Sequence, residues 1–281
     1  LGSSLEQNQS LTFLKLSGSK ISPAGVKTIA ASLGSNTNLQ QLILNNVEID
    51  IDELKGKTDL ATLDYSGKGF NDTSMVIVAA CLKENVVLTE LNMSLNDAGG
   101  EGLVAMAATL EINSSITSLD LSNKGKRHSV AGLAALGSAL SQNTALKRLK
   151  LTFFPLKLED LKGHTNKTTI DLSGYPYGDD DVPILWACLK QNKSVERVKL
   201  FDNQMGEYGA QMFGEVLEIN QTLVSVDLCN TKSAFGTIGI DYIRAGIAKH
   251  KSLKQLKLAN FNIPVHELNG NTGVKSLSFE N

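Results

Sequence analysis

The chain has 281 residues, of which 42% are hydrophobic and 20% charged. This composition excludes disordered, collagen-like and coiled-coil proteins. The 27 basic and 29 acidic side chains leave a formal charge of −2, so the chain as a whole has no electrostatic attraction to nucleic acid or to an anionic membrane. We therefore expect neither as a partner.

A leucine pattern recurs along the whole chain. The segment 88–93 reads L-x-x-L-x-L with methionine in the last place, and the same frame has eleven starts: Leu11, Leu39, Leu60, Leu88, Ile116, Leu146, Lys167, Val195, Leu223, Leu253 and Val274. Positions 1, 4 and 6 of the frame point inward and positions 3, 5 and 7 outward, as alternate residues of a strand do. Each frame therefore predicts a short strand with one buried face.

Most frames are followed by a helical pattern. After the strand at 88–93, one apolar helix face is formed by Leu103, Met106, Ala107 and Leu110. Ser22 and Pro23 have the residue types of a helix N-cap and first turn, and Asp181 and Pro183 suggest the same start further on. One strand–helix unit cannot bury its own apolar faces, but stacked units can.

These residues resemble the leucine-rich repeat family, and the spacings of 28 to 30 residues resemble its long-repeat, ribonuclease-inhibitor-like class. Ran GTPase-activating proteins, tropomodulin and NOD-like receptors carry similar arrays. The resemblance covers essentially the whole chain and implies an α/β solenoid, with parallel strands on the concave side and helices on the convex side. The family usually has Asn three residues after the last strand leucine, and here only Asn96 and Asn203 match.

A longer period lies above the short one. Units of 28, 28, 30 and 21 residues form a cassette of 107 residues that occurs twice, at 60–166 and 167–273. We predict a single repeat domain over 1–281 that is part of a longer array, with eleven parallel strands in one continuous curved sheet. Since neither end has a polar capping unit, we expect self-association through apolar residues exposed there: Leu11, Leu14, Leu277 and Phe279.

The 21-residue units are expected to differ from the others. They share a Leu-Lys-Gly or Leu-Asn-Gly signature at 54–56, 161–163 and 268–270. They have too little room for a full helix. We predict that an extended or single-turn segment replaces the helix at 45–59, 152–166 and 259–273.

No group of residues predicts catalysis, so we expect no enzyme activity, no cofactor and no metal. Asp179, Asp180 and Asp181 are interpreted as caps of a helix N-terminus, with calcium binding as the alternative. The four histidines fall in different parts of their units, have no metal-ligand spacing and are interpreted as surface or loop residues: His128, His164, His250 and His266.

The three cysteines form no disulfide framework, because their number is odd. Cys81 and Cys188 are interpreted as packed thiols, and Trp186 as part of a repacked core. Cys229 is expected to face the concave side, with a reactive thiol as the alternative.

Four of the seven N-x-S/T sequons share one place before a strand, so the repeat itself generates them: Asn8, Asn113, Asn192 and Asn220. Together these observations favour a cytoplasmic, intracellular protein.

The outward strand positions carry charges whose sign alternates between neighbouring strands from Asp120 to Lys257. One interpretation is a row of internal ion pairs, and the other is a polar recognition strip. We place the partner-binding site on this face because arginine and exposed aromatic residues are frequent interface anchors. The predicted site consists of Arg148, Lys150, Asp171, Arg197, Lys199, Phe201 and Asp227. Its modestly positive field suits an acidic protein surface.

The predicted function is a protein–protein interaction module that binds its partner on the concave face. One alternative is a regulator of a GTPase or another enzyme, which the resemblance to Ran GTPase-activating proteins implies, although no residue matches a functional motif of that family. The other is a structural spacer in a larger protein. A basic cluster at Lys124–His128 is interpreted as a solvated loop, with a phosphate or an acidic partner as the alternative.

Overall fold

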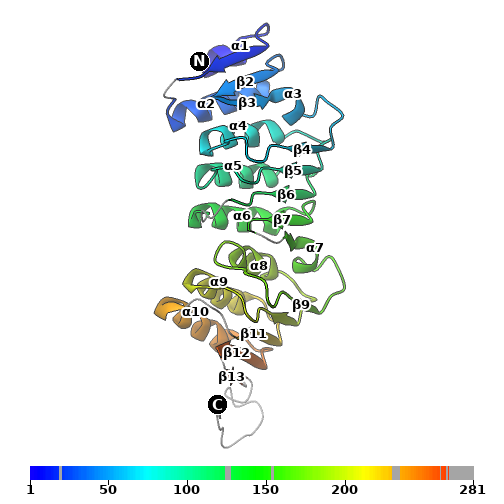
Figure 1. Ribbon diagram of the computed structural model, residues 1–281. Coiled ribbons are helices and arrows are strands. Elements are labelled where there is room, and N and C mark those ends of the chain that lie inside the picture. The colour runs from blue at the N-terminus through cyan, green and yellow to red at the C-terminus, as the bar shows by residue number, and fades with distance from the viewer. Residues whose placement is uncertain are drawn as a thin grey trace, which may run out of the picture. The chain divides into compact units, whose positions relative to one another are not determined.

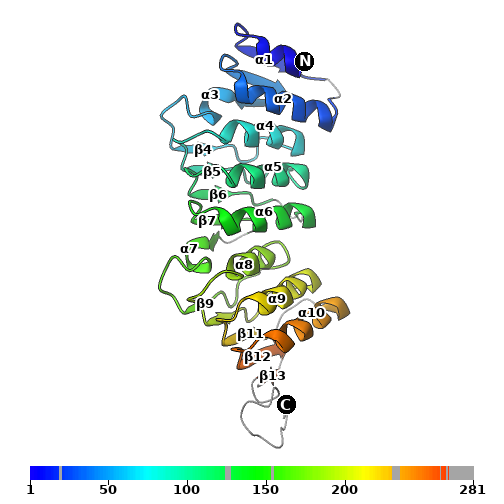
Figure 2. The same ribbon diagram turned by 180° about the vertical axis from the view of Figure 1, so that it is seen from behind.

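The computed structural model describes residues 1–18, 21–123, 128–152, 155–229, 235–259, 261–263 and 265. The chain divides into two compact units, Leu1–Leu151 and Thr152–Asn281, which are described separately. In each unit, strands form one layer and helices the other (Figures 1 and 2). The α/β repeat architecture predicted from the leucine frames is confirmed.

The first unit contains seven strands and six helices among its described residues. In chain order they are α1 (Gly2–Gln7), β1 (Phe13–Leu16), α2 (Pro23–Ser35), β2 (Gln41–Leu44), β3 (Val47–Asp50), α3 (Ile51–Leu54), β4 (Thr62–Asp64), α4 (Asp72–Leu82), β5 (Glu90–Asn92), α5 (Glu101–Leu110), β6 (Ser118–Asp120), α6 (Val130–Gln142) and β7 (Arg148–Lys150).

The second unit continues the pattern over the residues that are described. Its elements are β8 (Pro155–Lys157), α7 (Leu158–Leu161), β9 (Thr169–Asp171), α8 (Val182–Leu189), β10 (Arg197–Lys199), α9 (Glu207–Ile219), β11 (Ser225–Cys229), α10 (Gly236–Lys249), β12 (Gln255–Ala259) and β13 (Phe261–Ile263). Ten of the eleven predicted strands are present, and the frame from Val274 lies outside the described residues.

Parallel pairing follows the predicted register. Leu63, Leu91, Leu119 and Leu149 lie side by side on β4, β5, β6 and β7, and all four are buried. The helix face predicted after β5 is buried as well, because Leu103, Met106, Ala107 and Leu110 are each 2% exposed or less. Ser22 caps α2 by accepting a bond from the Gly25 N–H, with Pro23 in the first turn, as predicted.

The prediction of one continuous parallel sheet is wrong. β3 pairs antiparallel with β2, and β13 pairs antiparallel with β12. The β2–β3 hairpin turns at Asn45 and Asn46, whose φ angles are 51° and 66°, as a two-residue type I′ turn requires. Since β3 occupies the edge of β2 that the next parallel strand would need, the sheet ends there and β4 begins another.

The 21-residue units replace the long helix with one turn, as predicted for 45–59 and 152–166. Their helices α3 and α7 have four residues each. In the first of them, Gly56 ends the turn with φ 71°, a left-handed conformation that glycine adopts without strain. Lys55 donates to the carbonyl oxygens of Leu33 and Asn36 and so covers the end of α2. The third signature, at 268–270, lies outside the described residues.

A buried asparagine precedes most strands and links adjacent repeats. Its side-chain oxygen accepts backbone N–H bonds from residues two or three positions later, and its amide donates to carbonyls of the preceding repeat. The described members are Asn36, Asn85, Asn113, Asn143, Asn192 and Asn220. This inner ladder is the physical reason why asparagine recurs at this place, and three of its members lie in N-x-S/T sequons: Asn113, Asn192 and Asn220.

Other caps also link neighbouring repeats. Asp72 accepts from the N–H groups of Gly99 and Gly102 and so caps α5, the next helix along. Asp179, its equivalent 107 residues later, accepts from Gly206 and Gly209 at the start of α9. Capping by this acidic cluster is therefore confirmed for Asp179, but it acts on the following helix. Asp181 makes no side-chain cap bond to its own helix.

His250 takes the asparagine position before β12. It is 2% exposed, and its Nδ1 accepts from the N–H groups of Ser252 and Leu253 at 3.2 and 2.9 Å. Nδ1 therefore carries no proton in this arrangement. Burial lowers the pKa of His250 below its usual 6.5, because the imidazolium loses its hydration.

Replacing His250 tests its place in the ladder through pH. Since the pKa is lower in the folded chain, the unfolded chain binds more protons. The stabilising effect is thus complete above about pH 6.5 and is lost as pH falls. His250→Asn should remove only the part of the pH dependence that His250 causes, so the difference in urea midpoint between the variant and wild type should shift in the variant's favour as pH falls from about 7 to 5. Taking this difference at each pH cancels the effect of the other titrating groups of the second unit. The exposed His164 provides the control, His164→Asn, whose difference from wild type should stay constant; a constant difference in His250→Asn as well would contradict the assignment.

Candidate partner-binding surface

The alternating charges on the strands form ion pairs between neighbouring strands. The parallel register places Asp120 opposite Lys150 and Asp171 opposite Lys199, and the Nζ–Oδ2 distances are 3.0 and 3.1 Å. Lys257 and Asp227 form the same pair at 3.2 Å. The self-paired row that the sequence allowed is therefore present within each unit. Exposed pairs of this kind add little stability, at about 0–1 kcal/mol each.

Within the second unit, four predicted site residues lie on three adjacent strands, and the fifth, Phe201, follows the middle strand β10. The register places Asp171, Lys199 and Asp227 in one row across β9, β10 and β11. Arg197 lies on β10 and Phe201 follows it, with 46% of its surface exposed. Arg197 has Glu196 3.6 Å from its guanidinium, so acidic neighbours balance most of the positive charge of this row.

The remaining predicted site residues belong to the first unit. Arg148 and Lys150 lie on β7, and the guanidinium of Arg148 is 3.3 Å from Glu90. These two residues lie in a different compact unit from the row on β9, β10 and β11. A single binding patch that includes all seven predicted site residues therefore stays a prediction. Residues 124–127 of the basic cluster and Phe153 lie outside the described residues.

The candidate reactive groups show no arrangement for catalysis among the described residues. Cys81 and Cys188 are buried, as predicted, and burial raises the pKa of each thiol to about 12. Cys229 is half-buried, and burial together with its bond to Asp227 raises its pKa to about 11, which disfavours a reactive thiolate. No cluster of three or more metal-ligating side chains occurs in the described part of the chain.

Trp186 is fully buried and packs against Phe213, with ring centroids 4.7 Å apart. This contact confirms the repacked core that was predicted around it. His128 and His250 are also buried, so the interpretation as surface or loop residues is wrong in placing these two at the surface. His128 lies near the Leu151 carbonyl at 3.4 Å.

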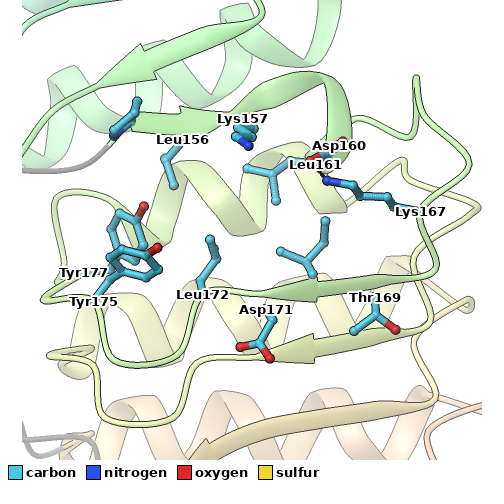
Figure 3. Close-up of a pocket in the computed structure, with 12 residues that line it drawn as sticks. Leu156, Lys157, Asp160, Leu161, Lys167, Thr169, Asp171, Leu172, Tyr175 and Tyr177 are labelled. Atoms are coloured by element: carbon cyan, nitrogen blue, oxygen red, sulfur yellow. Dashed lines mark hydrogen bonds and ion pairs between the residues drawn. The ribbon is translucent and has the colours of Figure 1, made fainter.

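A cavity in the second unit was not predicted. It has a volume of about 260 Å³ and lies between the segment of β8 and α7 and the strand β9. Figure 3 shows Leu156 and Leu161 on one side, Leu172 on the other, and Tyr175 and Tyr177 at one end. Comparing the two cassettes position by position would have provided the signal, because Leu172 replaces a tyrosine there.

The comparisons with known proteins agree with the repeat architecture. A family model described as "Leucine Rich repeat" matches residues 7–30 and 84–107. These units are leucine-rich repeats. Such repeats stack into extended surfaces that bind other proteins. In the described part of the chain, no helix is long and apolar enough to cross a membrane.

One curated relative is a Rho GTPase-activating protein, gacW, of Dictyostelium discoideum. It is 25% identical over 284 residues, which cover 89% of this chain and 24% of the relative. The chain thus spans about a quarter of the length of the curated relative it matches.

Two solved structures are also similar. A leiomodin-1 actin-binding site 2 structure is 21% identical with a TM-score of 0.28, covering 54% of this chain and 77% of its own. A tropomodulin C-terminal domain from Caenorhabditis elegans is 13% identical with a TM-score of 0.29, covering 54% of this chain and 80% of its own.

Proposed function

We propose that this leucine-rich repeat chain is a non-enzymatic protein-binding module and that its partner contacts the outward face of the strands in the second unit. The observation that carries the proposal is Phe201, a large apolar side chain that is 46% exposed beside a row of paired charges. Aromatic side chains next to arginine are typical anchors of protein interfaces. Strands fixed by a regular register hold these groups rigidly, which lowers the entropic cost of binding.

The partner's charge follows from the same contacts. Lys199 already faces Asp171, and Lys257 faces Asp227. An acidic partner would have to compete with these carboxylates, so its gain from electrostatic attraction would be small. We expect Phe201 and Arg197 to provide most of the affinity, and salt to weaken binding only modestly.

Two variants test the surface. Arg197→Ala and Phe201→Ala should each weaken capture of a partner from an extract of the source organism by roughly tenfold, about 1.4 kcal/mol. Neither should lower the melting temperature much, because both side chains are exposed. Lys193→Ala, exposed on the loop after α8, is the matched control and should bind like wild type. The captured protein is then titrated with all four chains.

The opposite pattern would exclude the strand face. If Lys193→Ala abolished capture while Arg197→Ala and Phe201→Ala retained it, the partner would bind elsewhere. If no protein were captured in a saturable way by any of the chains, the chain would be a spacer.

A second candidate function is regulation of a GTPase. The observation that favours it is the similarity to a Rho GTPase-activating protein, of which the match covers 24%. If the chain is only a binding module, as proposed first, it should leave the GTP hydrolysis rate of Rho-family GTPases unchanged when added alone. Acceleration of hydrolysis by the isolated chain would overturn the non-enzymatic proposal.

A further inference from the structure

The cavity beside β9 has a filled counterpart in the first cassette. The equivalent of Leu172, 107 residues earlier, is Tyr65. The Tyr65 ring stacks on Phe70 with centroids 5.4 Å apart, and its hydroxyl donates to Glu53 of α3 at 2.9 Å. That tyrosine therefore spans from the end of β4 to the one-turn helix.

In the second cassette residue 172 provides no ring, and the ring that packs on Tyr177 is that of Tyr175, with centroids 5.5 Å apart. The positions of Phe70 and Glu53 are taken by Tyr177 and Asp160, which keep an aromatic residue and a carboxylate in place. Both line the cavity, as does Leu172. Leucine is shorter than tyrosine and has no hydroxyl, so it cannot make the bond that Tyr65 makes to Glu53 in the first copy. Figure 3 shows the cavity that lies beside Leu172. The cavity thus lies between an aromatic pair, Tyr175 and Tyr177, and the carboxylate of Asp160, and residue 172 does not bridge them as Tyr65 bridges Phe70 and Glu53.

The charge at the edge of the cavity is also reversed between the copies. Asp50 at the start of α3 corresponds to Lys157 at the start of α7. Of the other charged side chains in the lining, Asp160 is paired with Lys167 at 2.6 Å and Asp171 with Lys199 at 3.1 Å. Lys157 is exposed and forms no ion pair of its own with any described residue. A carboxylate from outside could therefore pair with it.

The edge of β9 is open on the same side. Thr168 and Leu172 bond through their backbones to β10, so the alternate residues Thr169 and Asp171 direct their N–H and C=O groups away from β10. β9 is the last strand of its sheet. Such an edge can pair with an extended peptide backbone.

We propose that this cavity binds an extended segment of a partner protein that inserts an aromatic side chain next to an acidic residue. The ring enters the space between Leu172, Leu161 and the pair of Tyr175 and Tyr177, and the acidic residue pairs with Lys157. The site adjoins the strand-face surface proposed above, with which it shares Asp171, but it uses neither Arg197 nor Phe201 and would stand even if that surface bound nothing.

The probe is an acetylated and amidated peptide, Gly-Ser-Glu-Tyr-Ser-Gly, added to the full isotope-labelled chain and followed by amide NMR shifts. We expect saturable shifts at Thr169, Asp171 and Tyr177. A peptide with alanine in place of tyrosine should not produce them, and one with lysine in place of glutamate should bind several-fold more weakly.

Two variants of the chain test the site directly. Leu172→Tyr refills the cavity with the residue of the first cassette and should weaken peptide binding at least roughly tenfold, with an unchanged or higher melting temperature. Lys157→Asp should reverse the preference between the glutamate and lysine peptides. The converse variant, Tyr65→Leu, opens the first copy and should lower the melting temperature.

Several results would overturn the proposal. These are an absence of shifts near β9 at millimolar peptide, equal binding of the alanine peptide, and unchanged binding by Leu172→Tyr. Shifts confined to Arg197 and Phe201 would also overturn it while supporting the strand-face surface. Phe201→Ala should leave binding of the peptide to the cavity unchanged, which separates the failure of one proposal from the failure of the other.

Discussion

Replacing Asn113 with alanine should destabilise the first unit by about 3–5 kcal/mol, because its side chain loses four hydrogen bonds to backbone groups in a buried place. Its amide donates to the carbonyls of Leu82 and Asn85, both at 2.8 Å. Its oxygen accepts from the N–H groups of Ser115 and Ile116, both at 3.0 Å. The side chain is 3% exposed, so water cannot replace the lost partners.

The effect is measured by chemical unfolding followed by circular dichroism. Ser114→Ala changes the neighbouring exposed residue and should shift the midpoint little. Asn113→Asp should be nearly as harmful as Asn113→Ala, because a carboxylate cannot donate to the two carbonyls. A loss below about 1 kcal/mol in Asn113→Ala would mean that the ladder contributes little to stability.

The strand register could be predicted because the same leucine frame recurs in every unit, so each copy supports the alignment of the others. Leu63, Leu91 and Leu119 recur at the same place in each frame, and the structure pairs them directly. The inner ladder was visible only as a shared sequon position. Nothing in N-x-S/T shows that the asparagine points inward, since that depends on carbonyls supplied by the preceding repeat.

The breaks in the sheet could not be predicted from the leucine frames. The break after β2 depends on Asn45 and Asn46 both adopting positive φ, which asparagine tolerates but does not require. The cavity could not be predicted for a different reason. The exchange of Tyr65 for Leu172 is visible in the sequence, but its consequence depends on where the Tyr65 hydroxyl ends, beside Glu53. For the candidate site, the ion pairs followed from the sequence, whereas the balance of charge required the contact with Glu196.

Replacing Asp181 should have a second large effect, on how the stability of the second unit depends on pH. Its counterpart in the first cassette is Ser74, which forms a capping box with Asn71. In the second cassette Asp181 is 0% exposed, and the Thr152 hydroxyl donates to its Oδ2 at 2.7 Å. Its Oδ1 has no hydrogen-bond partner. Burial raises the pKa of Asp181 to about 7, and the negative charge of Asp180 adds to the shift.

This shift makes the second unit less stable as pH rises. Between the unfolded pKa of 3.8 and the folded pKa of about 7, the folded chain holds a proton that the unfolded chain has released. The stabilising effect is complete below the lower value and is lost as pH rises through the upper one. The loss between about pH 4 and pH 8 should approach, as an upper limit, about 4 kcal/mol.

Asp181→Asn removes the charge and keeps the shape. The variant should unfold at a similar denaturant concentration to wild type near pH 4, and at a clearly higher one near pH 8, because the buried carboxylate no longer has to ionise there. Asp241→Asn, at an exposed residue paired with Arg244, should follow the wild-type profile. A variant that lost stability with pH as wild type does would show that Asp181 is ionised at little cost and that another group sets the pH dependence.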